Sequence, residues 1–141
     1  MFKRILVPTD GSESSRHALI EALELARKFN SEVELFHVTI TQEAYYGYNE
    51  GYSTHINQEQ IEKNGQLALE ITLKDLNVEG VHFTKKHVSG NAASSILEEI
   101  RREFDLVVMG TRGLGTITGA IVGSVTQRVL ANSPAPVLIV K

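Results

Sequence analysis

The chain has 141 residues, the size of one ordinary domain, and a formal net charge of −3. Nucleic-acid-binding proteins normally present a basic face, so this balance gives no support to a nucleic-acid partner. The absence of cysteine excludes disulfides and thiolate metal sites. The N-terminal apolar run is too short for a signal peptide, and no stretch reaches the ~20 apolar residues of a membrane span. We therefore expect a soluble, cytoplasmic protein without a membrane partner.

Short apolar runs and helically spaced apolar stripes alternate along the chain. The runs suit strands buried on both faces, and Ser12 is the expected N-cap of the first helix. Gly65 weakens the second helical stripe because glycine is a poor helix former. In chain order, the predicted elements are a strand over 5–7 before Pro8, a helix over 12–30, a strand over 33–38, a helix over 61–76, a strand over 81–88, a helix over 93–104, a strand over 106–109, a helix over 124–131 and a strand over 137–140.

This alternation predicts the fold class. Strands that alternate with helices form a parallel sheet with helices on both faces. The expected architecture is therefore α/β, with an open, doubly wound, five-stranded, Rossmann-like parallel sheet. We find no internal repeat, linker or low-complexity segment, and expect one domain over residues 1–141.

The candidate ligand site follows two of the predicted strands. Ligands of open α/β sheets bind beyond the carboxyl ends of the strands, where the strand order reverses. Asp10 leaves the first strand, and a loop over 110–123 with five glycines leaves the fourth. Exposed amides followed by a helix at Ser124, with Arg112 as a fixed cation, suit a phosphate group. The alternatives are a plain connecting loop and a helix-capping role for Asp10.

Two common nucleotide motifs do not fit this loop. The Walker pattern requires a lysine directly before its Ser or Thr, and the loop contains no lysine. The dinucleotide fingerprint belongs in the first strand–helix turn, whereas Gly113 and Gly115 follow the fourth strand. A P-loop NTPase is therefore excluded and a Rossmann dehydrogenase is disfavoured.

Three segments resemble the ATP-binding branch of the universal stress protein family. They are 5–12 (ILVPTDGS), 107–113 (VVMGTRG) and 133–140 (SPAPVLIV). The spacing of Gly110, Gly113 and Gly123-Ser124 is similar to that family's nucleotide loop. The resemblance covers the whole chain and implies an adenine nucleotide alpha hydrolase-like sheet that binds ATP, with Mg²⁺ or Mn²⁺ held mainly by the phosphates.

The resemblance also implies roles for individual residues. Asp10 would accept hydrogen bonds from the ribose hydroxyls, and Arg112 stands at a position where members of the family vary. The adenine pocket would be lined by Pro8, Thr9 and Val38, with Met109 and Gly110 as its floor. The phosphates would be held by Gly113, Gly123, Ser124, Val125 and Thr126.

Other candidates are less specific. The histidines at 17, 37, 55, 82 and 87 lack the i, i+4 spacing of a helical metal site, so we expect packing roles. A Ser–His–Asp triad from Asp10, His17 and the nearby serines is disfavoured, since adjacent residues rarely supply that geometry. The tyrosines at 45, 46, 48 and 52 indicate either a surface loop or a lid or partner surface.

The favoured function is a nucleotide-dependent stress-response or signalling module with an unknown protein partner. The alternatives are a slow ATPase, for which no general base is evident, and an ATP pyrophosphatase-type ligase domain, where Glu13 would repel phosphate. The apolar last strand, at a sheet edge in the family's strand order, predicts a homodimer formed through residues 137–140.

Overall fold

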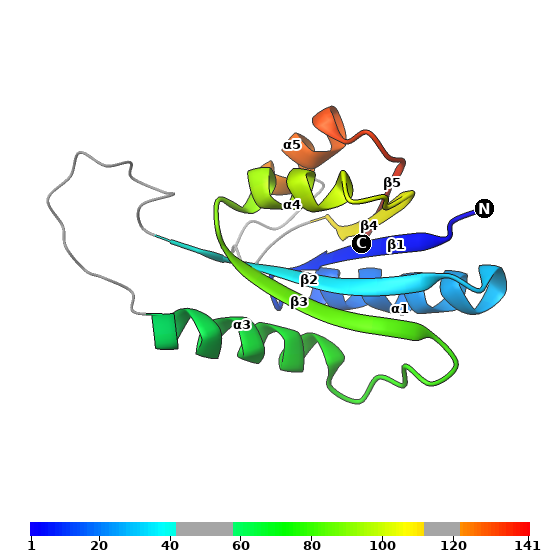
Figure 1. Ribbon diagram of the computed structural model, residues 1–141, viewed down its shortest axis with the longest axis horizontal. Coiled ribbons are helices and arrows are strands. Elements are labelled where there is room, and N and C mark those ends of the chain that lie inside the picture. Colours follow the sequence, from blue (N-terminus) through cyan, green and yellow to red (C-terminus); the bar gives the residue numbers. More distant parts are fainter. Residues whose placement is uncertain (42–57, 112–121) are drawn as a thin grey trace, which may run out of the picture.

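The strands form one parallel sheet in the order β3-β2-β1-β4-β5 (Figure 1). A computed structural model describes residues 1–41, 58–111 and 122–141 of the chain. The strand order reverses between β1 and β4, because β2 and β3 lie on one side of β1 and β4 and β5 on the other. The strands are β1 (Arg4–Thr9), β2 (Glu32–Ile40), β3 (His82–Gly90), β4 (Leu106–Gly110) and β5 (Val137–Val140). The predicted doubly wound fold class is confirmed.

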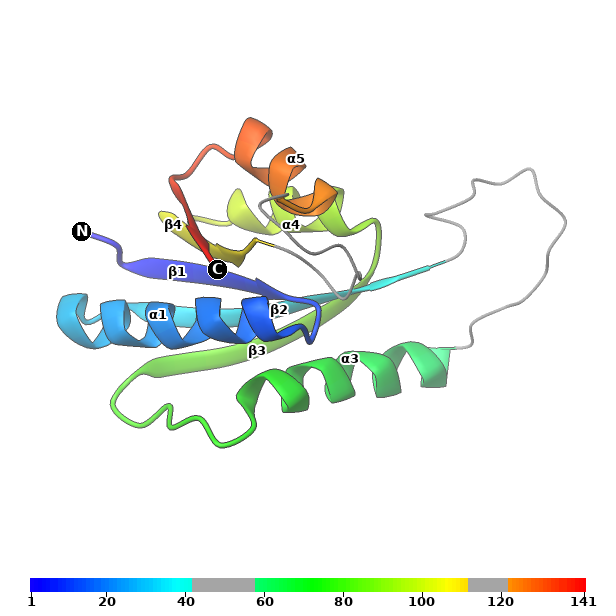
Figure 2. The same ribbon diagram turned by 180° about the vertical axis from the view of Figure 1, so that it is seen from behind.

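Helices cover both faces of the sheet, with α1 and α3 on one face and α4 and α5 on the other (Figures 1 and 2). The helices are α1 (Glu13–Phe29), α3 (Gln58–Leu73), α4 (Ala92–Ile100) and α5 (Ser124–Asn132). None of the helices within the described ranges is long and apolar enough to cross a membrane.

The alternation of side chains along the strands divides the core in two. Val7 and Leu35 pack in the cluster that contains α1, whereas Leu6 and Phe36 pack in the cluster that contains α4 and α5. All four side chains are at most 1% exposed. Continuous apolar runs therefore arise because each central strand is covered on both faces.

The ends of α1 follow from local chemistry. The side chain of Ser12 accepts a hydrogen bond from the backbone N–H of Ser15, which confirms the predicted N-cap. Asn30 closes the helix in the left-handed conformation, at φ 56°. The helix therefore begins and ends close to the predicted boundaries.

The first strand continues past Pro8, although we predicted that it would end there. The carbonyl oxygen of Arg4 accepts a hydrogen bond from the backbone N–H of Asp105, the residue just before β4. Backbone groups alternate between the two edges of a strand, so the backbone of Pro8, four residues further on, also faces β4. The registered pairing of β1 with β4 covers only Ile5 and Leu6. Because Pro8 has no N–H to donate toward β4, it cannot extend this ladder, and the registered pairing of β1 with β4 ends at Leu6.

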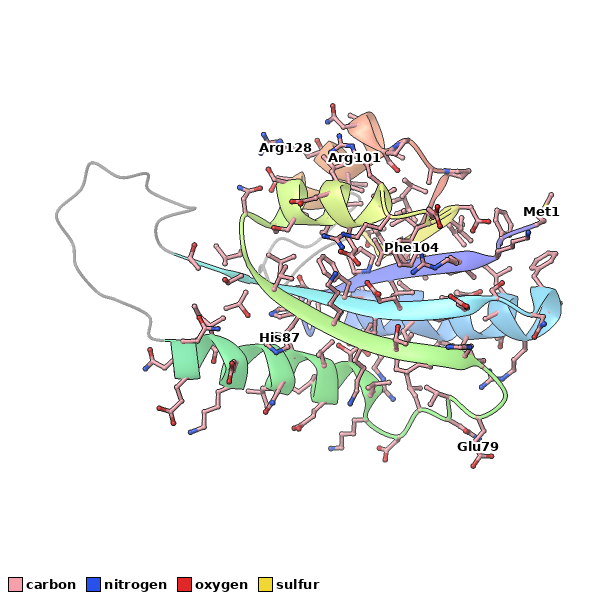
Figure 3. The ribbon with its side chains drawn as sticks, viewed as in Figure 1. Met1, Glu79, His87, Arg101, Phe104 and Arg128 are labelled. Carbon is pink, nitrogen blue, oxygen red and sulfur yellow. The ribbon has the colours of Figure 1, made fainter. Side chains whose placement is uncertain are left out.

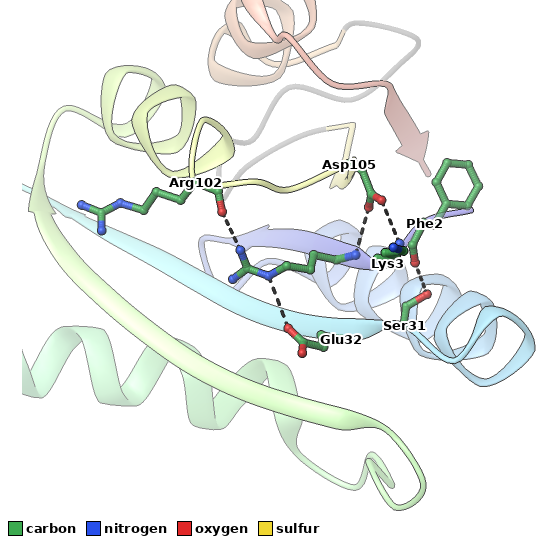
Figure 4. Close-up of polar contacts among 7 residues, drawn as sticks. Phe2, Lys3, Ser31, Glu32, Arg102 and Asp105 are labelled. Atoms are coloured by element: carbon green, nitrogen blue, oxygen red, sulfur yellow. Dashed lines mark hydrogen bonds and ion pairs between the residues drawn. The ribbon is translucent and has the colours of Figure 1, made fainter.

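The amino end of the sheet is held together by polar contacts (Figure 4). The Asp105 carboxylate accepts from the backbone N–H groups of Lys3 and Arg4, at 2.8 and 2.9 Å. The Arg4 side chain forms an ion pair with Glu32 at 3.3 Å and lies 4.3 Å from the Phe104 ring centroid. Phe104 was predicted inside a helix, but α4 ends before it and the ring packs beneath Arg4 instead.

Gly65 is required by the packing of α3, whereas the sequence suggested only that it weakens the helix. A Cβ atom at Gly65 would lie 2.6 Å from Nδ1 of His87 on β3. Figure 3 labels His87 where β3 faces α3. The glycine therefore lets the helix approach the sheet closely, at the usual cost in helix propensity.

Candidate functional site

A cavity of about 340 Å³ opens where the strand order reverses. This volume lies at the lower end of the range typical of small-molecule sites. It is the expected place for a ligand, since β1 and β4 are neighbours and both carboxyl ends border it. The lining residues are Pro8, Thr9, Asp10, Ser15, Phe36, Val38, Ile40, Ala92, Ile96, Met109, Gly110, Gly123, Ser124, Val125 and Thr126.

Every predicted site residue that the structure describes lies in this lining. Residues from β1, β2, β4 and the start of α5 thus meet although they are far apart in sequence. Arg112 and Gly113 lie outside the described residues, as do the tyrosines at 45, 46, 48 and 52 and His55.

One part of the cavity is apolar. Phe36, Val38 and Ile40 come from β2, Ile96 from α4 and Met109 from β4. Phe36, Val38, Ile96 and Met109 are at most 8% exposed, so their positions are fixed by packing. Such a chamber suits a flat, weakly polar ring system.

The single ionisable side chain among the described lining residues is Asp10. Its Oδ1 atom accepts from the backbone N–H of Ser12 at 2.9 Å and from the Ser15 hydroxyl at 3.3 Å. Both contacts involve the same carboxylate oxygen. The capping alternative for Asp10 is therefore partly correct, because the carboxylate supports the turn into α1 while it also borders the cavity.

The start of α5 offers amide groups to the cavity. The N-caps of α1 and α4 are Ser12 and Asn91, whose side chains accept from the helix amides. The N-cap of α5 is Gly123, which has no such side chain. The first-turn amides of α5 thus lack a side-chain cap, and the positive end of the helix dipole favours an anion there.

Two expected phosphate contacts have other partners in the structure. The Gly123 N–H donates to Thr111 O at 2.7 Å, and the Thr126 hydroxyl donates to Gly110 O at 3.0 Å. The Thr126 side chain is 5% exposed, and its buried hydrogen bond joins the first turn of α5 to the last residue of β4. A phosphate contact from Thr126 would therefore involve its backbone amide rather than its hydroxyl.

The histidines that the structure describes form no metal centre. No group of three or more His, Cys, Asp or Glu side chains suited to a metal occurs in the described ranges. Burial lowers the pKa of His37, against the opposing effects of Thr9 and Asp10. The ring of His17 contacts Lys141 O at 2.9 Å and Glu13 at 3.9 Å, which gives no support to a triad with the neighbouring serines.

Sequence reasoning missed several lining residues. Phe36, Ile40, Ala92 and Ile96 carry the same apolar signal as core residues, so nothing in the pattern marks them as lining a cavity. Ser15 was considered only for a triad. Its place beside Asp10 at the first turn of α1 was the available signal.

The fold and the cavity define a doubly wound parallel α/β protein with a small-molecule-sized site at its switch point. The model of the universal stress protein family matches residues 1–141. Over the whole chain and 83% of its own length, the universal stress protein MJ0531 of Methanocaldococcus jannaschii is 33% identical. The chain belongs to the universal stress protein family.

Solved structures of the family share the fold. The universal stress protein UspA from Lactobacillus plantarum has a TM-score of 0.82 at 20% identity, covering 99% of this chain and 98% of its own. A universal stress protein in complex with cAMP has a TM-score of 0.68 at 23% identity, covering 99% and 97%. Another, from Archaeoglobus fulgidus in complex with dAMP, has a TM-score of 0.66 at 21% identity, covering 99% and 98%.

Proposed function

We propose that the chain binds an adenine nucleotide, with ATP as its ligand, and acts as a nucleotide-dependent stress-response or signalling module. The observation that carries the proposal is the single cavity lining shared by all the described residues that the sequence assigned to the nucleotide. The neighbours solved with cAMP and with dAMP support an adenine ligand for this fold.

The cavity divides into parts that match the parts of a nucleotide. The apolar chamber around Val38 and Met109 receives the adenine ring. Asp10 accepts from the ribose hydroxyls, because an ionised carboxylate is a strong acceptor. The amides at the start of α5, beginning at Ser124, hold the phosphates. Arg112 and Gly113, which lie outside the described residues, are also assigned to the phosphates in this proposal.

A divalent cation accompanies the ATP in this proposal. Mg²⁺ or Mn²⁺ is held mainly by the phosphate oxygens and by water, since Mg²⁺ commonly takes few protein ligands. Asp10, the one carboxylate of the described lining, is assigned to the ribose and is not needed as a metal ligand.

The chain acts as a binding module rather than as an efficient enzyme in this proposal. ATP hydrolysis requires an oriented water and stabilisation of charge at the γ-phosphate. The described lining residues at the α5 end of the cavity are Gly123, Ser124, Val125 and Thr126, none of which is a general base. Occupancy of the site then changes the surface offered to a protein partner.

A second copy of the chain pairs along β5 in the same proposal. The sheet has β3 and β5 as its outer strands. Strand β3 carries Lys85 and Lys86, charges that discourage edge pairing, whereas β5 is the apolar run Val137–Val140. An antiparallel pairing of two β5 strands would bury Leu138, which is 39% exposed.

Calorimetric titration with MgATP tests the proposal. The expected result is saturable binding with thermal stabilisation of the protein, because a ligand that binds only the folded state stabilises it. A parallel measurement identifies nucleotide released when the purified protein is denatured and chromatographed. No binding heat and no stabilisation at millimolar MgATP would rule the proposal out.

A further inference from the structure

The carbonyl oxygen of Thr9 accepts a hydrogen bond from a side chain of the neighbouring strand. The Nδ1 atom of His37 on β2 lies 2.7 Å from this oxygen, which belongs to the residue directly before Asp10. Thr9 is 6% exposed and His37 is 9% exposed, so water does not readily replace this contact. The contact therefore joins β1 to β2 at a buried point beside the cavity, which Thr9 lines.

The direction of donation in this contact follows from the two atoms involved. A carbonyl oxygen can only accept, so the Nδ1 atom of His37 must be the donor. Burial lowers the pKa of His37, which favours the neutral ring at neutral pH. A neutral imidazole holds one proton on its two ring nitrogens, and this contact places that proton on Nδ1.

The contact lies where β1 leaves the sheet. The registered pairing of β1 with β2 ends at Thr9 and His37, whereas β2 continues beside β3 as far as Ile40. On the other side of β1, the registered pairing with β4 ends at Leu6. Asp10, the next residue of the chain, therefore has no registered strand partner. The His37 imidazole thus holds the carbonyl group at which the chain turns away from the sheet.

The Asp10 carboxylate is held from two sides. Because the peptide bond is planar, fixing the Thr9 carbonyl also fixes the direction of the Asp10 N–H and the position of its Cα atom. On the other side, Asp10 Oδ1 accepts from the backbone N–H of Ser12, the N-cap of α1, at 2.9 Å. One attachment is therefore on the sheet and the other is at the start of α1.

The His37 side chain does not itself line the cavity. Side chains alternate along a strand, so Phe36 and Val38 of β2 line the cavity while His37 lies on the opposite face of the sheet. Any effect of His37 on a ligand must therefore act through the residues that it holds.

We propose that His37 is a positioning residue for ribose recognition. Its Nδ1–H holds the Thr9 carbonyl, and with it the Asp10 carboxylate, at the place where the ribose hydroxyls bind. The inference rests on the proposed function, in which Asp10 binds the ribose. It gives His37 a role beyond the packing that the sequence suggested.

Two substitutions of His37 separate hydrogen bonding from packing. His37→Phe keeps a flat ring in the buried space but has no donor. His37→Asn packs less well because it is smaller, but its side-chain amide can donate to the Thr9 carbonyl from nearly the position of Nδ1. If His37 serves only packing, Phe should replace it better than Asn does. The proposed role predicts the reverse for ribose recognition.

The measurement is the ratio of the dissociation constant for Mg-2′,3′-dideoxyATP to that for MgATP. In the parent protein this ratio should be about tenfold or more, because only ATP has hydroxyls to donate to the carboxylate. His37→Phe should lower the ratio at least about threefold, whereas His37→Asn should keep it within about twofold of the parental value. Circular dichroism confirms that each variant is folded.

His87→Phe is the matched control. His87 is the register partner of His37 on β3, and its Nδ1 atom is buried without a hydrogen-bond partner among the described residues. The same substitution there removes an imidazole without removing a donor to Thr9. The ratio should therefore equal that of the parent.

The tautomer of His37 gives a signature that is independent of nucleotide binding. Long-range ¹H–¹⁵N correlation spectra of the nucleotide-free protein at neutral pH distinguish a protonated from an unprotonated ring nitrogen. The expected result is a protonated Nδ1 and an unprotonated Nε2 in His37. The opposite tautomer would overturn the proposal, because Nδ1 would then have no proton to donate to Thr9.

Each outcome of the titrations supports or overturns the proposal. A parent that discriminates the two nucleotides, with an unchanged ratio in His37→Phe, overturns the role of His37 and leaves the proposed function standing. An equal loss in His37→Phe and His37→Asn also overturns it, since the donor would then not matter. If His37→Asn does not fold, His37→Phe and the tautomer decide the matter. A parent that binds neither nucleotide, or binds both equally, overturns the proposal together with ribose binding by Asp10.

Discussion

Gly110, the last residue of β4, lies directly against Ser14 in the first turn of α1. A Cβ atom built on Gly110 would lie 2.1 Å from Ser14 Oγ, 2.6 Å from its carbonyl carbon and 2.8 Å from its carbonyl oxygen. Two of these atoms belong to the backbone, so a side-chain rotation cannot relieve the clash. The glycine that resembles a nucleotide-loop residue is therefore also needed where α1 packs against β4.

Gly110→Ala should destabilise the protein in the absence of nucleotide. The expected loss is about 1–3 kcal/mol, as is usual when a packed site is overfilled. Denaturant unfolding of the nucleotide-free variant and parent measures this loss. Equal stability, with loss of ATP binding alone, would show that Gly110 serves only the ligand.

Variants at Gly123, Ser124 and Asp10 distinguish phosphate from ribose recognition. Gly123→Val places a side chain at the N-cap of α5 and should block ATP while leaving adenosine binding largely intact. Ser124→Ala removes one hydroxyl donor to a charged acceptor, worth about 1.5–3 kcal/mol or roughly tenfold to a hundredfold in affinity. Asp10→Ala should weaken ATP and adenosine alike, because both contain the ribose.

Binding titrations with ATP and adenosine check these expectations, with circular dichroism to confirm folding. Tight ATP binding by Gly123→Val would mean that the phosphates lie elsewhere, and the loop before α5 would then be structural.

The buried Glu99 and the half-buried Glu34 predict a pH dependence of stability. Lys86 Nζ donates to both oxygens of Glu99, at 2.9 and 3.0 Å, while Glu34 Oε1 is buried without a donor. Burial raises the pKa of Glu34 from 4.5 to about 7. A hydrogen bond to Glu99 and the negative charge of Glu99 raise this pKa further, whereas the positive charges of Lys86 and Arg4 lower it. Two carboxyl groups can share such a bond only when one keeps its proton.

The folded state therefore favours protonated Glu34. Its contribution to stability is fully present below about pH 4.5 and is lost as the pH rises toward about 7. Glu34→Gln can donate to Glu99 at every pH, so its stability should fall less than that of the parent across this window. Urea unfolding at several pH values measures the difference. The matched control Glu32→Gln, at an exposed side chain, should keep the parental slope, and an equally steep slope in Glu34→Gln would contradict the prediction.

The β5 edge predicts a dimer that one charge can break. Leu138→Glu should convert the protein to a monomer at micromolar concentration, because the charge would be buried against its own copy in the pairing. Sedimentation or light scattering measures the mass. Leu67→Glu is the control, since Leu67 is 55% exposed on α3 and should leave the dimer intact. A monomeric parent would refute this interface.

Hydrolysis of ATP should be slow or absent. The described cavity lining offers Asp10 as its one carboxylate, and that residue is assigned to the ribose. Turnover should therefore lie well below the ~1–100 s⁻¹ typical of kinases. A sensitive phosphate-release assay on rigorously purified protein tests this, with Asp10→Ala to identify contaminating activity. Turnover within the kinase range that survives purification would contradict it.

The sequence alone determined the order of strands and helices along the chain, and it predicted residues that line the cavity. Apolar runs and helical stripes are local periodicities, so they predicted α1 and its Ser12 cap as well as the short strand β4. Asp10 and Gly123 were predicted as site residues because parallel strands end at a common edge of the sheet, where ligands bind, and both residues line the cavity.

Only the tertiary structure decided what meets at that edge. The pairing of β1 with β4 opens the cavity, and Ile96 lines it although its pattern is that of an ordinary core residue. The requirement for glycine at Gly110 and the hydrogen bond from His37 to Thr9 come from contacts across long stretches of chain. Local sequence patterns contain no information on such contacts, because a buried face of a helix or strand has the same apolar periodicity whichever element packs against it.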